Sequence, residues 1–134
     1  MIIIGEITRK QLTDCLKLVL KKQGFKKTKT TWRKTTDDLI YVLNIQGSQW
    51  SEEDYYINVA LYIKAIGEEE NPPEYRCHIR GQIENEVYVC SSIYEEVSNW
   101  FEKYGDIERL RTLWRKSELP LMVTVNAQNY LNES

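Results

Sequence analysis

The first clear pattern along the chain is a single apolar stripe with a helical period. Apolar residues recur every three or four positions at Leu12, Cys15, Leu16, Val19 and Leu20. This spacing is typical of an amphipathic helix with one buried face. Thr8 and Gln11 have capping-box spacing, and Gly24 is the residue type that ends helices in a left-handed conformation. The pattern therefore predicts a helix from Thr8 that ends before Gly24, with Cys15 packed as a small hydrophobic side chain.

After this helix the apolar period changes to two, which is typical of β-strands that present two different faces. Four segments show it: Thr28–Thr35, Leu39–Gln46, Tyr55–Ile66 and Tyr75–Ile83. In the last of them we expect Tyr75, Cys77 and Ile79 to face inward. The segment Val87–Cys90 is compatible with a short fifth strand.

The C-terminal part returns to a helical period and predicts two to three helices. They are a helix from Ser92 to Gly105, a helix that Asp106 can cap, and a short helix from Ala127 to Leu131. No helical crossover separates consecutive strands, so the order of elements predicts an α+β fold with an antiparallel meander of about four or five strands. No linker divides the chain, and residues 1–134 are expected to form a single domain.

Charge adds one candidate feature to this picture. The net charge of −2 argues against a broad electrostatic surface for nucleic acid. One local basic cluster follows the first helix, at Lys21, Lys22, Lys26, Lys27 and Lys29. Cations at a helix C-terminus suit the helix dipole, so a solvated turn explains the cluster without a ligand. RNA binding through basic and aromatic residues is a further hypothesis, which predicts affinity that falls steeply with salt.

Compartment and cofactors follow from what the sequence lacks. No apolar run approaches the length of a bilayer span, and no signal peptide is recognisable, so no membrane association is expected. The three cysteines form no CxxC pair, which fits reduced thiols and a cytoplasmic protein. One histidine and three scattered cysteines are a poor basis for a zinc site, and no metal or cofactor is expected.

Strand alternation gathers polar side chains on the second face of the predicted sheet. They are Asn44, Gln46, Tyr56, Asn58, Tyr62, Arg76, His78, Arg80 and Gln82. In adjacent strands these groups would stand within reach of one another. Such a surface suits an anion or the carboxylates and amides of a protein partner, because arginine offers a planar fork to acidic groups. Two alternatives stay open: a plain solvated face, or a face covered by the C-terminal helices.

His78 is the only histidine and follows Cys77 directly. Adjacent strand residues point to opposite faces, so this dipeptide is a poor nucleophile and base pair. The sequence contains no GxGxxG, no phosphate-binding loop and no GxSxG turn. A non-enzymatic binding protein is therefore favoured. The alternative is a small-molecule or nucleotide-handling enzyme that uses His78 and Arg80 in the same face.

Five stretches share a pattern with a known family. They are Gly24–Lys27, Thr31–Arg33, Asn44–Trp50, Tyr56–Val59 and Cys77–Ile83. The most specific parts are Asn-x-Gln-x-Ser-x-Trp and Cys-His-x-Arg. From about Gln11 to Leu131 the chain resembles the bacterial domain of unknown function family 4304, whose members usually carry Arg where this chain has Gln82.

The resemblance implies a small bacterial cytoplasmic domain of helix-meander-helix build without an established activity, in a family where an immunity role against toxins is one expectation. The residues that match its recurring polar positions are Asn44, Gln46, Ser48, Trp50, Asn58, His78 and Arg80. We therefore expect a protein partner, a toxin, to bind a face of ten residues. These are Asn44, Gln46, Ser48, Trp50, Tyr56, Asn58, Arg76, His78, Arg80 and Gln82. Nothing in the sequence indicates the oligomeric state.

Overall fold

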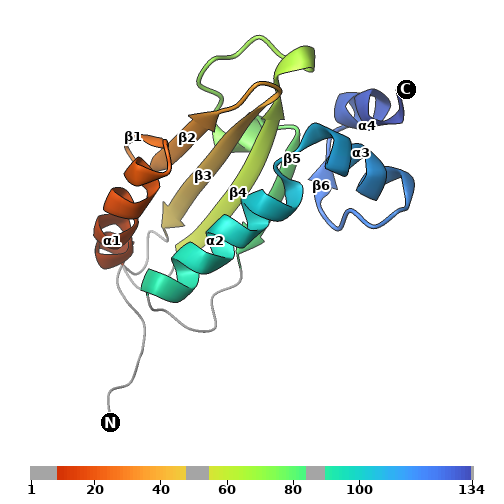
Figure 1. Cartoon of the computed structure of the whole chain (residues 1–134). Helices are drawn as coiled ribbons and strands as arrows, with labels where there is room; N and C mark the ends of the chain where they lie inside the picture. Colours follow the sequence, from red (N-terminus) through yellow and green to blue (C-terminus); the bar gives the residue numbers. More distant parts are fainter. Residues whose placement is uncertain (1–8, 48–54, 84–89, 134) are drawn as a thin grey trace.

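The protein is an antiparallel sheet with helices packed on one face (Figure 1). The computed structural model describes residues 9–47, 55–83 and 90–133. The elements follow in the order α1 (Arg9–Lys22), β1 (Lys26–Thr28), β2 (Thr31–Thr35), β3 (Leu39–Gly47), β4 (Tyr55–Ile63), the 3-10 turns η1 (Lys64–Ile66) and η2 (Glu74–Arg76), β5 (Ile79–Ile83), α2 (Cys90–Tyr104), α3 (Ile107–Arg115), β6 (Met122–Val123) and α4 (Val125–Asn132).

Each strand of the sheet pairs with the next one along the chain. The order is β1-β2-β3-β4-β5-β6, and all five pairings are antiparallel. The expected α+β class with an antiparallel meander and C-terminal helices is therefore confirmed. Within the described residues the sheet has six strands, where the sequence predicted four or five.

The end of α1 is set by two backbone hydrogen bonds. Gly24 has a φ of +92°, its N–H donates to the carbonyl of Lys21 (3.1 Å), and Phe25 N–H donates to the carbonyl of Leu20 (3.0 Å). These two bonds form a Schellman motif, which uses carbonyls that the helix itself leaves unpaired. The predicted stop before Gly24 is confirmed, and it turns Phe25 into the core. Thr8, the predicted start, lies outside the described residues.

The observed sheet differs from the predicted strands in two places, the first hairpin and β6. The single strand expected over Thr28–Thr35 is a hairpin, because the chain reverses at Lys29, whose φ is 56°. Neither Gly nor Pro marks this turn, so no turn was predicted here from the sequence. Met122 and Val123, where the sequence predicted no strand, pair with Arg80 and Ile79 and extend the sheet.

The segment Val87–Cys90 does not end as a strand. Cys90 begins α2, and the rest of the segment lies outside the described residues. The later helices follow their predicted limits more closely. Asp106 caps α3 by accepting a hydrogen bond from the Arg109 N–H (3.0 Å), as expected for this residue type. Among the described residues, no helix is long and apolar enough to cross a bilayer.

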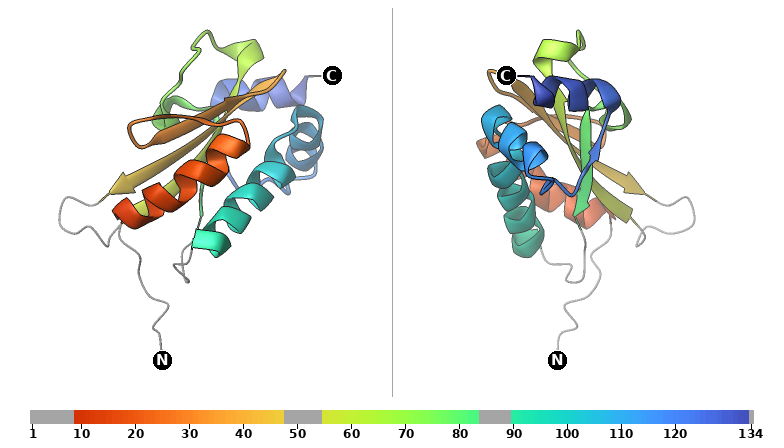
Figure 2. Two further views of the ribbon diagram at one scale, coloured as in Figure 1. Left: turned by 60° about the vertical axis from the view of Figure 1, so that its left-hand side comes forward. Right: turned by 90° about the vertical axis from the view of Figure 1, so that its right-hand side faces the viewer.

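The main core lies between the sheet and the helices. Leu12, Leu16 and Leu20 of α1 are at most 1% exposed, and they belong to one buried cluster with alternate residues of β3 and β4 and with apolar residues of α2, α3 and α4. Figures 1 and 2 show α1 and α2 side by side on this face of the sheet. This burial explains why the α1 stripe and the strand alternation were readable in the sequence.

A second, smaller cluster lies on the opposite face. It consists of Ile40, Val42, Ala60, Tyr62 and Cys77. The connection from η1 to β5 packs against this cluster through three hydrogen bonds: Glu69 N–H to the Tyr62 hydroxyl (3.1 Å), the Cys77 thiol to the Pro73 carbonyl (3.5 Å) and Arg33 Nε to the Pro72 carbonyl (2.9 Å). The connection covers one half of the second face. The half toward the start of β4 is not covered by any helix that the structure describes (Figure 2).

Replacement of Gly24 by Ala tests the α1 stop. A Cβ there would meet only Lys34 methylene carbons, the nearer at 3.6 Å, so space is sufficient and the cost comes from the positive φ. We expect the free energy of unfolding to fall by about 1–2 kcal/mol, as measured by urea denaturation. The neighbouring Gln23→Ala variant is the control, and we expect it to change stability by less than about 0.5 kcal/mol. Equal effects of both variants would contradict the assigned role of Gly24.

Candidate binding face

The open half of the second face carries a row of polar side chains that crosses four strands. The β-sheet register places Thr31 opposite Asn44, Asn44 opposite Asn58, and Asn58 opposite Gln82. Gln46 stands two residues along β3 on the same side. The predicted strands are therefore neighbours, and these polar side chains share one face. We call Thr31, Asn44, Gln46, Asn58 and Gln82 the amide row.

Asn58 is the centre of the amide row. Its side chain accepts a hydrogen bond at Oδ1 from Gln82 Nε2 (3.0 Å) and donates from Nδ2 to Gln46 Oε1 (3.1 Å). Asn44 Nδ2 donates separately to the Thr31 hydroxyl (2.9 Å). Asn58 is only 4% exposed, whereas Gln46 and Gln82 are both exposed. A buried amide thus holds two exposed amides in fixed orientations.

Each glutamine uses one amide atom to bind Asn58, and its other amide atom has no partner among the described residues. Gln46 Nε2 and Gln82 Oε1 make no hydrogen bond with the residues that the structure describes. The row therefore offers one donor over β3 and one acceptor over β5. The two hydrogen bonds run in one direction, from Gln82 to Asn58 and from Asn58 to Gln46, so they polarise one another.

Arg80 lies beside the row but is already paired. Its Nε and Nη2 donate to the two carboxylate oxygens of Glu74, at 2.9 and 3.1 Å. The side chain of Glu74 is 10% exposed and that of Arg80 is 32% exposed. The hydrogen bond with Glu74 raises the pKa of Arg80 above its ordinary value, and burial opposes it. The face therefore presents a neutral ion pair here, where the sequence predicted an unpaired guanidinium.

Arg76 and His78 are not on the open face in the way predicted. Arg76 lies in η2 and pairs with Glu69 at 2.9 Å, with 57% of its side chain exposed. His78 packs against Tyr62 of the second face, but the exposure expected for it is wrong, because the residue is 6% exposed. Its Nδ1 accepts a hydrogen bond from the backbone N–H of Ile63 (2.9 Å), and its ring lies 4.5 Å from the ring of Tyr62.

The position of His78 follows from the end of the β4–β5 ladder. His78 N–H still pairs with the Leu61 carbonyl, but η2 turns the chain away before it can pair with Ile63. The imidazole supplies the acceptor that Ile63 N–H would otherwise lack. Burial lowers the pKa of His78 below its ordinary value, with an opposing effect of Glu69.

The same turn explains two further corrections. Cys77 was expected on the inward face with Ile79, but it belongs to the second cluster, and Tyr75, also expected inward, is 68% exposed. Strand alternation does not apply to them because η2 precedes β5. Burial raises the pKa of Cys77 to about 12, so its thiol stays protonated at neutral pH. A protonated thiol is a poor nucleophile.

The prediction that all three cysteines are reduced is wrong for Cys15, which is disulfide-bonded. Cys77 is free and buried. The cysteine argument for a reducing compartment therefore loses its basis, and a cytoplasmic location stays a prediction.

Of the three remaining predicted residues, one lies on the open face and two lie outside the residues that the structure describes. Tyr56 lies opposite Gln46 and is 56% exposed. Ser48 and Trp50 lie outside the described residues. The sequence analysis missed Thr31, Glu74 and Met122, since only the strand register and the η2 turn bring them to this face.

A shallow hollow of about 330 Å³ adjoins the amide row. It is lined by Asn58, Glu74, Arg80, Gly81, Gln82 and Met122.

Neither metal ligands nor covering helices were found on this face. In the parts of the chain that the structure describes, no group of three His, Cys, Asp or Glu side chains is placed to hold a metal ion. The buried residues of α1 to α4 all belong to the main core on the other face. The alternative in which C-terminal helices cover the polar side chains is therefore not what the structure shows.

The architecture defines an α+β protein whose antiparallel sheet has one helix-covered face and one half-open polar face. Over residues 16–117 the chain matches the family model described as "Domain of unknown function (DUF4304)". The match covers most of the chain, and the protein belongs to this family, as the resemblance indicated. No curated protein and no solved structure shows significant similarity to it.

The pH dependence of stability tests the structural role of His78. Burial holds the pKa of folded His78 below its ordinary value of 6.5, so the unfolded chain binds a proton more readily than the folded one. This contribution to stability is complete above pH 6.5 and is lost as pH falls through 6.5 toward the folded pKa. The free energy of unfolding of the wild type, measured in urea, should therefore fall from pH 7.5 to pH 5.

His78→Gln is the matched variant, because its amide oxygen can accept from Ile63 N–H but does not titrate. We expect this variant to lose less stability than the wild type over the same pH range. Parallel pH profiles of the two proteins would show that His78 titrates freely, contrary to its buried position.

Proposed function

We propose that the protein is a non-catalytic binding protein that recognises a protein partner through the open half of its second sheet face. The observation that carries this proposal is the hydrogen-bonded amide row, in which buried Asn58 holds the exposed Gln46 and Gln82. In keeping with the family resemblance, we propose an immunity role in which the partner is a toxin.

Pre-organisation supports a binding role for these amides. An exposed glutamine ordinarily loses rotamer freedom on binding, which costs about 0.5–1.5 kcal/mol per side chain. Gln46 and Gln82 are already held by Asn58, and Asn58 stands on a strand paired on both sides. Part of this entropy is therefore lost on folding, before a partner arrives.

Exposed apolar side chains flank the amides and supply contact area. Tyr56, opposite Gln46, is 56% exposed, and Met122, opposite Arg80, is 63% exposed. Tyrosine is enriched among residues that dominate binding energy, and methionine adapts its shape to a partner. The arrangement is a polar centre between two apolar anchors. Ser48 and Trp50 stay candidate contacts outside the described residues.

The charges of this face favour a partner of mixed polarity over a polyanion. Arg80 is paired bidentately with Glu74, and Arg76 is paired with Glu69. Both guanidinium groups already have a carboxylate partner, and the net charge of the chain is −2. A protein surface with carboxamide or main-chain donors and acceptors fits better than a nucleic acid.

The enzyme alternative finds no support in the geometry of His78 and Arg80. A general base needs a ring nitrogen within reach of a substrate proton. His78 is 6% exposed and uses Nδ1 for the Ile63 N–H, and Arg80 is bound to Glu74. We therefore propose binding without catalysis.

A double variant, Gln46→Ala with Gln82→Ala, tests the proposed face. Both side chains are exposed, so we expect the fold to be kept while the outer donor and acceptor are lost. The partner is the protein that co-purifies at one-to-one stoichiometry from the native source; it is then prepared pure and titrated by calorimetry. We expect at least a tenfold weaker affinity, about 1.4 kcal/mol.

The matched control removes two exposed amides from the helices, Asn99→Ala with Asn129→Ala. We expect its affinity to stay within twofold of the wild type. A folded Gln46/Gln82 double variant that binds as tightly as the control would reject this face. For the immunity role, expression of the wild type should protect cells from the partner, and expression of the double variant should protect them less.

A further inference from the structure

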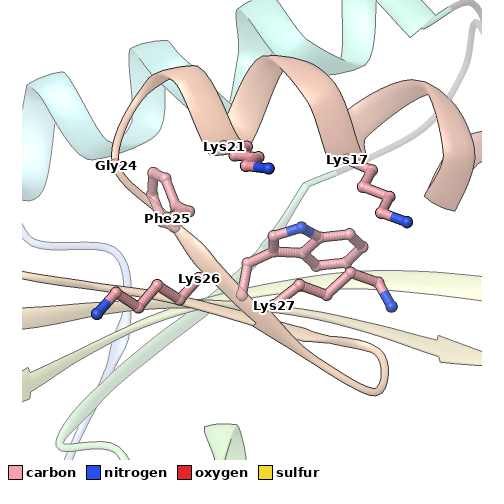
Figure 3. A pocket seen from close by; sticks show the side chains of 7 residues that line it. Lys17, Lys21, Gly24, Phe25, Lys26 and Lys27 are labelled. Carbon is pink, nitrogen blue, oxygen red and sulfur yellow. The ribbon is translucent and has the colours of Figure 1, made fainter.

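A second candidate site lies on the other side of the sheet, where the end of α1 meets the β1–β2 hairpin. A hollow of about 420 Å³ opens there. Its lining residues are Lys17, Lys21, Gly24, Phe25, Lys26, Lys27 and Trp32. Figure 3 shows Lys17 and Lys21 on α1 above the hollow and Lys26 and Lys27 on the strand below it. The four lysines are exposed, so cationic groups surround an interior of methylene and aromatic carbon atoms.

Trp32 at the base of this hollow has an unmet hydrogen bond. The residue is 1% exposed, and its indole Nε1 has no hydrogen-bond partner among the described residues. A buried donor without an acceptor costs about 1–3 kcal/mol. Buried polar groups in native proteins are almost always paired, and an exception calls for an explanation such as a ligand that is not present.

The helix dipole does not account for these features. Lysines near a helix C-terminus suit the negative end of the dipole within the last turn. Lys17 lies five residues before the end of α1, outside that turn. Lys27 belongs to β1, and its ammonium lies 5.5 Å from the centre of the Trp32 ring. Dipole compensation also leaves the indole N–H without an acceptor.

We propose that this hollow binds a small organic anion with an apolar body. The anionic head accepts a hydrogen bond from Trp32 Nε1–H and pairs with the ammonium groups of Lys17 and Lys21. The apolar body lies against Phe25 and the lysine methylene groups. The volume of about 420 Å³ falls within the range of small-molecule sites. The four lysine side chains that line the hollow are exposed, and exposed side chains change rotamer within nanoseconds, so they can admit the head group.

The chemistry of the hollow distinguishes this ligand from two other anions. A bare inorganic anion would gain nothing from the apolar lining and finds no arginine fork here. A single-stranded nucleic acid needs an exposed aromatic face on which a base can stack, and Trp32 is 1% exposed. The site is independent of the proposed protein partner, because Trp32 stands on the helix-covered face, opposite Leu43.

Binding of naphthalene-1-sulfonate to the full chain tests the site. Calorimetry should show one-to-one binding that is at least tenfold tighter than binding of neutral 1-naphthalenemethanol or of inorganic phosphate. The indole N–H resonance of Trp32, assigned with the Trp32→Phe variant, should shift downfield as the donor gains an acceptor. If Trp32→Phe does not fold, selective mutation of the other three tryptophans assigns the resonance.

A matched pair of variants separates the site from general charge. Lys17→Gln with Lys21→Gln should weaken naphthalene-1-sulfonate binding at least tenfold. Lys10→Gln with Lys22→Gln removes the same charge from the same helix outside the lining and should change affinity less than twofold. Each of the following would overturn the proposal: no binding, equal loss in both pairs, an unmoved Trp32 resonance, phosphate binding as tightly as the probe, or displacement of the probe by a tighter-binding oligothymidine.

Discussion

The register of β3 against β4 is the constraint on which the rest of the structure depends. Nine residue pairs connect the two strands, from Leu39 opposite Ile63 to Gly47 opposite Tyr55. A slip by one residue would move every side chain of a strand to the other face. The observed register puts Leu43 and Val59 together in the main core and Asn44 and Asn58 together on the opposite side. The core and the amide row are thus consequences of one alignment.

The second face is divided by what lies above it. Toward the end of β4 the alternating residues are apolar, and the η1–η2 connection covers them with its own hydrogen bonds. Toward the start of β4 the same alternation gives Asn58 and Tyr56, and the amides satisfy one another. The apolar half needs a cover because its side chains cannot be left in water without cost. The polar half is stable uncovered, which leaves it available to a partner.

Much of the fold was readable from the sequence because its signals are local. The α1 stripe, the Gly24 stop, the Asp106 cap and the alternation of β3 and β4 each depend on residues a few positions apart. Alternation also placed Asn44, Gln46, Asn58 and Gln82 on one face, which the strand register confirms.

The remaining features depend on turns and contacts that periodicity does not contain. The hairpin at Lys29 has no glycine or proline, and β6 is only two residues long. The η2 turn interrupts the alternation before β5, so His78 becomes buried and Arg80 finds Glu74 across the turn. The burial of the Trp32 indole without a hydrogen-bond partner among the described residues depends on how α1 packs against the hairpin, which periodicity does not indicate.

The central position of Asn58 has one more consequence, which concerns how the two exposed glutamines are coupled. Asn58 offers its oxygen to Gln82 and its nitrogen to Gln46. If its amide group rotated by half a turn, both glutamines would have to rotate with it, and the outward donor over β3 and the outward acceptor over β5 would exchange places. The three amides therefore have two mutually satisfied orientations, and a ligand whose donor and acceptor match one orientation would face donor with donor and acceptor with acceptor in the other.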